Sequence, residues 1–291
     1  MTSTTTGALT PGTHTIDVEG IAQRYHVAGT GPVCVAHSGG PGLAWEYLRM
    51  PGLEEHLTMV YLEPIGTGDS GRLADPTGYH LDTYARFLHA VVEHLDAGKV
   101  TLLGHSHGGF VIQRYALDHP DRVTSLVLYD TSPVTGLEFW NNAVANLQQF
   151  AQEHTDQPEA AEMVPAFTTL TPDLDDEQMT ARLRTIMPAY VADYWGREAE
   201  FAPFRAQMRV WTAPSLGVEP APFDVRSRLN EITVPSLVVV GSQDFICGTR
   251  WATMLDAGLP NVTLVEFDNC GHLAHLEYPA EFTAEVAKFV G

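Results

Sequence analysis

Gly104-His105-Ser106-His107-Gly108-Gly109 follows an apolar run, Val100–Gly104, and opens a helical pattern that continues to about Asp118. This order predicts a strand, a tight turn at the serine and then a helix. A serine in such a turn is crowded by its neighbours, and the glycines two residues before and after it relieve the crowding. Its hydroxyl lies at the N-terminus of the helix, where free N–H groups favour developing negative charge. The stretch therefore predicts Ser106 as a nucleophile.

Outward from this turn, short apolar runs alternate with helical patterns such as Leu81–Leu95, which is typical of strand–helix–strand units. The expected strands are a hairpin at His14–Val27 that turns near Gly20, then Pro32–His37, Thr58–Leu62, Val100–Gly104, Val123–Tyr129, Ser236–Val240 and Val262–Phe267. A closing helix is expected around Phe282–Val290. The predicted fold class is α/β, with a mostly parallel twisted sheet flanked by helices.

Residues 133–228 break this alternation, because they lack β-branched runs and show helix-like segments at Phe139–His154 and Met179–Trp195. We expect an all-helical lid over the sheet edge where ligands bind in open α/β folds. The core would then comprise residues 1–132 and 229–291.

The predicted lid is rich in aromatic residues, and most of them are expected to pack in its own core. Trp140, Tyr194 and Trp195 are the candidates that we assign to substrate binding. The lid leaves the substrate undefined, since pocket size and polarity depend on how its helices pack.

A neutral serine hydroxyl needs a general base, usually a histidine held by a carboxylate. His272 follows Asn269-Cys270-Gly271 in a loop before the last helix and is the preferred base, with His275 as the alternative. Asp244 ends the turn after the strand Ser236–Val240 and is the preferred acid. Asp130, at the tip of the strand that follows the nucleophile helix, is the competing acid.

Stabilising an oxyanion requires two N–H donors. One is expected from the backbone of His107, and the other from the loop His37–Gly42, with Gly40 preferred and Gly39 next. We expect the His107 side chain to line the pocket and His105 to pack beneath the turn. No Asp, Glu or Cys at a standard ligand spacing accompanies these histidines, so neither a metal nor a cofactor is predicted.

Bulk composition excludes several classes of protein. The net charge is −20, which disfavours binding to nucleic acid and to anionic membranes. Met1–Gly12 has no signal-peptide pattern, and the three cysteines suggest no disulfide framework. A cytoplasmic protein with a small-molecule substrate is expected, and the oligomeric state stays open.

These motifs resemble the proline iminopeptidase branch of the α/β-hydrolase superfamily. The matching segments are Gly39-Gly40-Pro41-Gly42, Gly66-x-Gly68-x-Ser70, the turn at Ser106, the Gly-x-x-Asp turn at Asp244, and Gly271-His272. Ser38 and Ile65 depart from the branch, which has histidine and arginine there. The resemblance covers about residues 14–132 and 229–291 and implies an α/β-hydrolase fold.

The resemblance implies a serine hydrolase that cleaves an ester or amide bond through an acyl-enzyme, as an aminopeptidase, a carboxylesterase or a lactonase. Aminopeptidases of this branch hold the substrate amine with acidic lid residues, and the lid carboxylates that could serve are Glu138, Asp193, Glu198 and Glu200. One alternative is a cofactor-free dioxygenase or lyase that uses the same His-Asp pair, since the serine turn also resembles that of ring-cleaving dioxygenases. Another is a ligand receptor built on a hydrolase fold.

Overall fold

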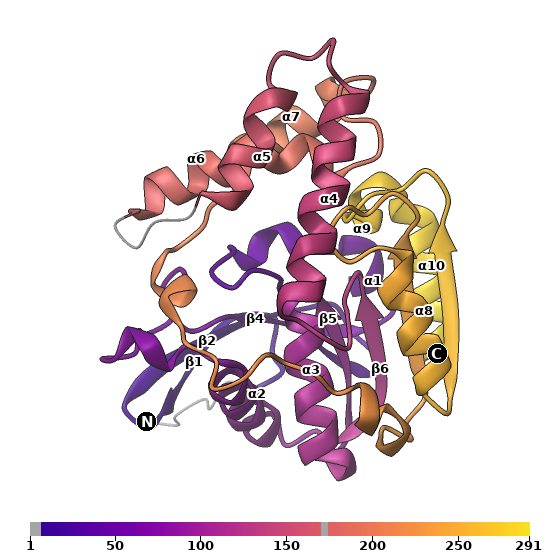
Figure 1. The fold of residues 1–291 in the computed structure, drawn as a ribbon. Coiled ribbons are helices and arrows are strands. Elements are labelled where there is room, and N and C mark those ends of the chain that lie inside the picture. Colours follow the sequence, from indigo (N-terminus) through magenta and orange to yellow (C-terminus); the bar gives the residue numbers. More distant parts are fainter. Residues whose placement is uncertain (1–6, 170–173) are drawn as a thin grey trace.

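The computed structural model describes residues 7–169 and 174–291. Eight strands form one sheet in the order β1-β2-β4-β3-β5-β6-β7-β8 (Figure 1). Their bounds are Gly12–Val18, Ile21–Ala28, Val33–His37, Thr58–Glu63, Val100–His105, Val123–Tyr129, Ser236–Gly241 and Val262–Phe267 for β1 to β8. The pairs β1–β2 and β2–β4 are antiparallel and the remaining five are parallel. The predicted class, a mostly parallel α/β sheet, is confirmed.

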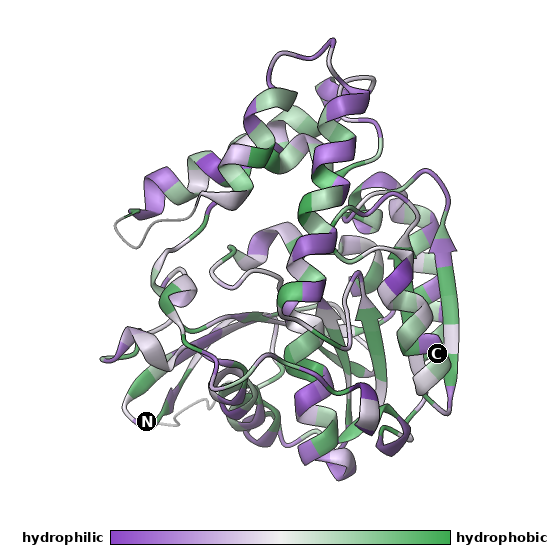
Figure 2. Cartoon of the chain, viewed as in Figure 1, coloured by the Kyte–Doolittle hydropathy of each residue, from purple (hydrophilic) through white to green (hydrophobic). Residues whose placement is uncertain are grey.

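Helices cover both faces of the sheet because successive side chains of its central strands point to opposite faces and both faces are apolar. Leu102 of β5 packs in the cluster that contains the helices α2, α3 and α8, whereas Leu103 packs in the cluster that contains α1 and α10. Figure 2 shows the resulting apolar strands inside helices with a polar outer side. The helix bounds are Pro51–Glu54 for α1, Leu81–Leu95 for α2, His107–Asp118 for α3, Thr249–Gly258 for α8, Ala274–Glu277 for α9 and Pro279–Val290 for α10.

The strand order reverses between β3 and β5. After β3 the chain adds β4 on one side and then returns to place β5 on the other. Ligands bind at such a switch point, outside the carboxyl ends of the strands. The two segments that leave the sheet here are the glycine loop after His37 and the turn at Ser106, so the topology brings both candidate motifs together.

Between β6 and β7 the described residues form helices and short 3₁₀ turns but no regular strand. The helices are Leu137–Glu153 (α4), Ala160–Thr168 (α5), Asp176–Ile186 (α6) and Glu198–Gln207 (α7). They rise above the carboxyl edge of the sheet in Figure 1. We refer to residues 133–228 as the helical insertion. The 3₁₀ turns among the described residues are Trp45–Leu48, Pro76–Gly78, Pro120–Arg122, Met187–Tyr190, Ala213–Leu216 and Arg226–Glu231.

One predicted helix is shorter than expected. The segment Met179–Trp195 is α-helical only to Ile186, after which a 3₁₀ turn runs over Met187–Tyr190. Pro188 explains the break, because it has no N–H to donate to the carbonyl of Arg184. That carbonyl instead accepts a hydrogen bond from Arg205 Nε at 2.6 Å.

Within the part of the chain that is described, no helix combines the length and apolarity needed to span a membrane. The stretch Met1–Gly12, which has no signal-peptide pattern, is described only from residue 7, because residues 1–6 lie outside the described residues.

Candidate active site

Ser106 occupies a strained turn between β5 and α3. Its φ of 53° and ψ of −119° are rare for a residue with a side chain and are typical of functional positions. A Cβ at Gly104 would lie 2.5 Å from the carbonyl oxygen of Gly108, and one at Gly108 would lie 2.2 Å from that of His37. The spacing of small residues in the sequence is therefore required by close backbone contacts. The turn is held by Ser106 N–H, which donates to the carbonyl of Tyr129 at 2.9 Å.

His272 and Asp244 form a buried hydrogen-bonded pair. His272 Nδ1 lies 2.7 Å from Asp244 Oδ2, and the two residues are 3% and 5% exposed. Asp244 Oδ1 accepts the N–H groups of Ile246 and Cys247 at 2.8 and 3.0 Å, which fixes the carboxylate. Because a carboxylate accepts, Nδ1 carries the proton and Nε2 of the neutral ring has a free lone pair. The arrangement prepares His272 to take a proton at Nε2.

Ser106 and His272 line the same cavity. Among the described residues the Ser106 hydroxyl has no hydrogen bond to His272, and it lies beside the Cys247 thiol. Catalytic hydrogen bonds are often long or misaligned without substrate, so this geometry is compatible with a nucleophile and base that align when a ligand binds. Burial raises the pKa of the Cys247 thiol well above its ordinary value, which leaves it protonated.

The alternative base has no free ring nitrogen. His275 Nδ1 lies 2.8 Å from the hydroxyl of Tyr129, and Nε2 lies 2.8 Å from the carbonyl oxygen of Tyr47. Burial lowers the pKa of His275 to about 4. These contacts place His275 in the packing beneath the site. The alternative acid, Asp130, is fully buried and accepts the N–H of Gly241 at 2.9 Å.

The glycine loop offers one free candidate donor rather than two. Gly39 N–H donates to the Tyr47 hydroxyl at 2.7 Å, so it is occupied. Gly40 lines the cavity. His107 is the first residue of α3, and the first N–H groups of a helix have no partner inside it. Gly40 and His107 therefore remain as the pair available to an oxyanion.

His105 connects the glycine loop to the loop of the candidate base. Its Nε2 lies 2.9 Å from the carbonyl oxygen of His272, and its Nδ1 lies 2.5 Å from the Tyr47 hydroxyl. Since a carbonyl only accepts, Nε2 carries the proton, Tyr47 donates to Nδ1, and the Tyr47 oxygen accepts from Gly39. Burial holds the pKa of His105 well below its usual range, so the ring stays neutral. His105 is therefore buried beneath the turn and also borders the cavity.

The His107 side chain does not line the cavity. Its ring packs edge-to-face against Tyr84, with ring centroids 5.1 Å apart, and it also faces Phe110. Burial lowers the pKa of His107 to about 3. Its contribution to the site is limited to the backbone N–H.

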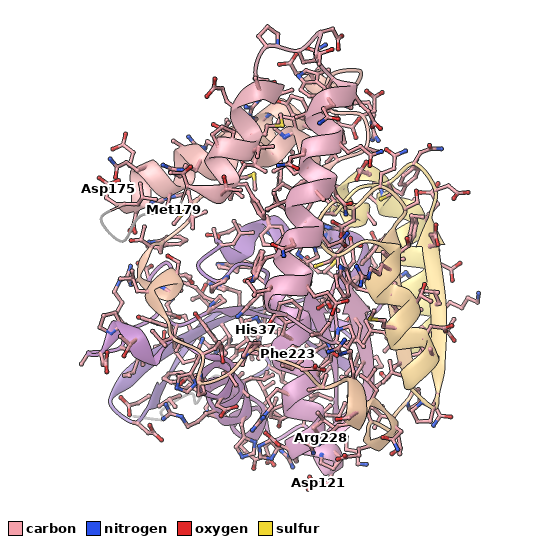
Figure 3. All side chains as sticks on the ribbon, viewed as in Figure 1. His37, Asp121, Asp175, Met179, Phe223 and Arg228 are labelled. Atoms are coloured by element: carbon pink, nitrogen blue, oxygen red, sulfur yellow. The ribbon has the colours of Figure 1, made fainter. Side chains whose placement is uncertain are left out.

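The cavity above Ser106 has a volume of about 470 Å³ and is lined mostly by apolar side chains. Met179, labelled on α6 in Figure 3, and Trp140 of α4 are on its wall. Arg182 of α6 is the one Lys or Arg among the described lining residues, and none of these residues is Asp or Glu. Such a cavity suits an apolar body that carries one negative group.

Several residues singled out from the sequence lie away from this cavity. Tyr194 is 1% exposed and packs against Trp195 with ring centroids 6.0 Å apart. Trp195 donates from Nε1 to Glu159 Oε1 at 2.8 Å and stacks on Phe150. Tyr194 and Trp195 therefore belong to the packing of the helical insertion. The lid carboxylates that we considered for an amine, Glu138, Asp193, Glu198 and Glu200, are absent from the cavity wall.

A short backbone clamp joins the glycine loop to the insertion. Ala44 N–H donates to the carbonyl of Arg209 at 3.0 Å, and Trp211 N–H donates to the carbonyl of Gly42 at 2.8 Å. Leu43 and Val210 form the antiparallel bridge between these bonds. The clamp holds residues next to Gly40 against a segment that returns from α7.

Two groups of buried side chains have the composition of metal ligands. His105, Asp130 and His272 form one group, and Asp244, Cys247 and His272 form the other, each with ligand atoms within 4.8 Å of one another. His272 belongs to both groups, and its Nδ1 is already paired with Asp244. A metal would therefore compete with the hydrogen bond that orients the candidate base.

Sequence reasoning missed two residues of the site. Arg182 follows Met179 by three positions and precedes Ile186 by four, so a charge inside an apolar helical stripe was the available signal. Tyr47 has no local signal, because its partners Gly39 and His105 lie 8 and 58 residues away in the chain.

The model of the α/β-hydrolase fold family matches residues 31–279, and the chain belongs to this family. It is 28% identical to a 2-hydroxy-6-oxononadienedioate/2-hydroxy-6-oxononatrienedioate hydrolase of Cupriavidus pinatubonensis, over 91% of this chain and 88% of the relative. It is also 28% identical to a 2-hydroxymuconate semialdehyde hydrolase of a Pseudomonas species, over 93% of this chain and 91% of that relative.

Solved structures show the same fold at lower identity. A hydrolase of Bacillus anthracis is similar with a TM-score of 0.73 and 17% identity, covering 95% of this chain and 98% of that one. An enol-lactonase of Burkholderia xenovorans is similar with a TM-score of 0.72 and 21% identity, covering 95% and 99%. The predicted superfamily is confirmed. The relatives named here are hydrolases of other substrates and do not single out the proline iminopeptidase branch.

Proposed function

We propose that the chain is a serine hydrolase that acts on a small, largely apolar substrate bearing one carboxylate. The observation that carries this proposal is the Asp244–His272 pair beside a cavity that Ser106 shares with a single guanidinium, that of Arg182. Residues 133–228 act as the lid that closes this cavity over the core.

The proposed reaction proceeds through an acyl-enzyme. Ser106 Oγ attacks the substrate carbonyl while His272 Nε2 takes its proton and Asp244 stabilises the resulting imidazolium. The N–H groups of Gly40 and His107 bind the oxyanion. His272 returns the proton to the leaving group, and water, deprotonated by the same histidine, then releases the acid and restores Ser106.

Arg182 supports a carboxylate on the substrate. Its guanidinium is next to Met179, Leu183 and Ile186 on the cavity wall, and its contact inside the protein is a long one, 3.4 Å from Nη1 to the carbonyl oxygen of Ala166. A guanidinium in apolar surroundings gains a charge-assisted hydrogen bond from a bound carboxylate. The free amine of a peptide would meet this positive charge instead of an acid, which argues against an aminopeptidase.

The relatives suggest which bond is broken. A 2-hydroxymuconate semialdehyde has neither an ester nor an amide, so its hydrolysis breaks a carbon–carbon bond next to a carbonyl. A carbon–carbon hydrolase for an unsaturated keto acid is therefore the first candidate. An esterase or lactonase is the second, because the same serine, histidine and oxyanion donors serve an oxygen leaving group, and the cavity wall is apolar enough for either.

The test combines active-site labelling with a substrate panel. A fluorophosphonate should label Ser106 in the wild type and leave Ser106→Ala unlabelled, as read by mass spectrometry. 2-Hydroxymuconate semialdehyde, a p-nitrophenyl ester, a lactone and prolyl-naphthylamide then separate the candidate bonds. Oxygen uptake on a heteroaromatic substrate without labelling would instead indicate the dioxygenase, and ligand binding without turnover or labelling would indicate a receptor.

A further inference from the structure

Asp130 is a buried carboxyl group that the proposed reaction leaves without a role. It follows the last residue of β6 with a φ of 43°, and it is fully buried. Its Oδ1 accepts the N–H of Gly241 at 2.9 Å, whereas Oδ2 has no hydrogen-bond partner among the described residues. A buried polar atom left unpaired costs about 1–3 kcal/mol, so its presence calls for a physical reason.

The unpaired group lies beside the candidate base. A carboxylate oxygen of Asp130 and one ring nitrogen each of His105 and His272 are all within 4.8 Å of one another. His105 cannot pair with it, because both of its nitrogens are occupied, by Tyr47 and by the carbonyl of His272. His272 is therefore the ring that an Asp130 oxygen can reach.

The charge of Asp244 disfavours ionisation of Asp130. Burial, and next to it the charge of Asp244, raise the pKa of Asp130 well above its ordinary value. Two carboxyl groups that share one low-dielectric site do not both ionise readily, so one keeps its proton while the other carries the charge. With Asp244 ionised and bonded to His272, Asp130 is held as the neutral member of the pair.

We infer that Asp130 is a second positioning carboxylate for His272, which takes over the orientation of the imidazole when Asp244 cannot serve. This inference rests on the proposed serine hydrolase function. Burial and the charges of Asp244 and Glu277 keep Asp130 neutral, and removing the charge of Asp244 removes the larger of the two charge effects. The gap that Asp130 must close, from within 4.8 Å to a hydrogen bond of about 2.7 Å, is small enough for a shift of the histidine loop.

The other buried acid near the histidine loop is already occupied. Glu277 accepts the N–H of Gly271 at 2.7 Å and that of Ala192 at 2.8 Å, which uses both of its oxygens. It serves as the control for loss of charge near Asp130, because it is a buried carboxyl group on the histidine loop with both oxygens bonded, and its charge also raises the pKa of Asp130.

The experiment is a double-mutant cycle on Asp244→Asn and Asp130→Asn, read as the rate of fluorophosphonate labelling at Ser106 and as kcat and KM on the substrate turned over. Replacing the acid of a serine triad by asparagine typically costs about 10⁴ in kcat. With a second acid available, Asp244→Asn should cost only about 10²-fold, and Asp130→Asn in that background a further ten-fold or more in kcat at similar KM. Asp130→Asn alone should lower kcat about two- to three-fold.

The inference would be overturned if Asp130→Asn lowered kcat by the same factor in the wild type and in Asp244→Asn. A loss of about 10⁴ in kcat from Asp130→Asn alone would also overturn it. Glu277→Gln removes a charge near Asp130 but keeps its carboxyl group, so it should not reproduce the further loss that Asp130→Asn causes in the Asp244→Asn background. Melting curves of every variant check the fold, and Asp130→Ser repeats the comparison if asparagine lowers the melting temperature. A wild type that is not labelled at Ser106 would refute the proposed function itself, which separates the two failures.

Discussion

The sheet core and the helical insertion contribute different kinds of group to the candidate site. Ser106, Asp244 and His272 all follow strands of the core, and backbone bonds such as Ser106 N–H to Tyr129 fix them. The groups from the insertion, Trp140 and Arg182, stand on helix faces, and Trp140 is 46% exposed. The core thus supplies the candidate reacting side chains, whereas the insertion supplies much of the cavity wall and one backbone bond to the base, from His272 N–H to the carbonyl of Tyr190 at 2.8 Å. Substitutions in the two regions should therefore change different kinetic constants.

The largest effect is expected in the core. Ser106→Ala should lower kcat by about 10⁴-fold or more, because the nucleophile is lost while the cavity remains. Ser215→Ala, in a serine of the insertion that lines the same cavity, should keep kcat within about three-fold. Steady-state kinetics on one substrate compare the two. A similar loss in both variants would contradict the division between core and insertion.

Arg182 should affect binding rather than chemistry. Arg182→Gln should raise KM for a carboxylate-bearing substrate about ten- to 100-fold, the value of a hydrogen bond to a charged group. A neutral ester should bind as before. Arg184→Gln is the matched control, since the Arg184 guanidinium bonds the carbonyl of Met208 at 2.9 Å and is not on the cavity wall. If Arg182→Gln changed KM equally for carboxylate-bearing and neutral substrates, Arg182 would have no role in recognising the carboxylate.

The core should lose stability in acid because it buries neutral histidines. The pKa of His275 is about 4 in the folded protein and about 6.5 when unfolded. Between these values the unfolded state binds the extra proton, so the free energy of unfolding falls as the pH drops through that range. His275→Gln should remove about 2 kcal/mol of the fall between about pH 7 and pH 5 in urea titrations. The exposed His56→Gln should leave the fall unchanged.

The smallest effects should separate two tryptophans of the insertion. Trp140→Ala should raise KM for apolar substrates about three- to ten-fold with little change in melting temperature, because the ring lines the cavity and is half exposed. Trp195→Ala should lower the melting temperature and leave KM within about two-fold, since the ring packs on Phe150 away from the cavity. If Trp140→Ala lowered the melting temperature and Trp195→Ala raised KM, the assignment of the two tryptophans would be wrong.

The sequence predicted the core better than the insertion, for physical reasons. Close backbone packing at Gly104 and Gly108 leaves a readable glycine spacing, and strands buried on both faces leave apolar runs. The histidine–aspartate pair could be predicted from its placement after strands. In the insertion, by contrast, Tyr194 and Trp195 look like binding residues but face inward, because the packing of short amphipathic helices is decided by distant contacts. Arg182 differs, because its position inside an apolar helical stripe was a signal that the sequence did carry.

The clamp between Gly42–Ala44 and Arg209–Trp211 has a consequence for redesign. Exchanging residues 133–228 for the equivalent segment of another family member would remove the segment that pairs with the glycine loop. The new segment would have to contain an extended stretch that pairs with Gly42–Ala44 in the same register. Without that pairing we expect the glycine loop to lose order and kcat to fall on every substrate. The helical insertion therefore cannot be exchanged independently of the glycine loop.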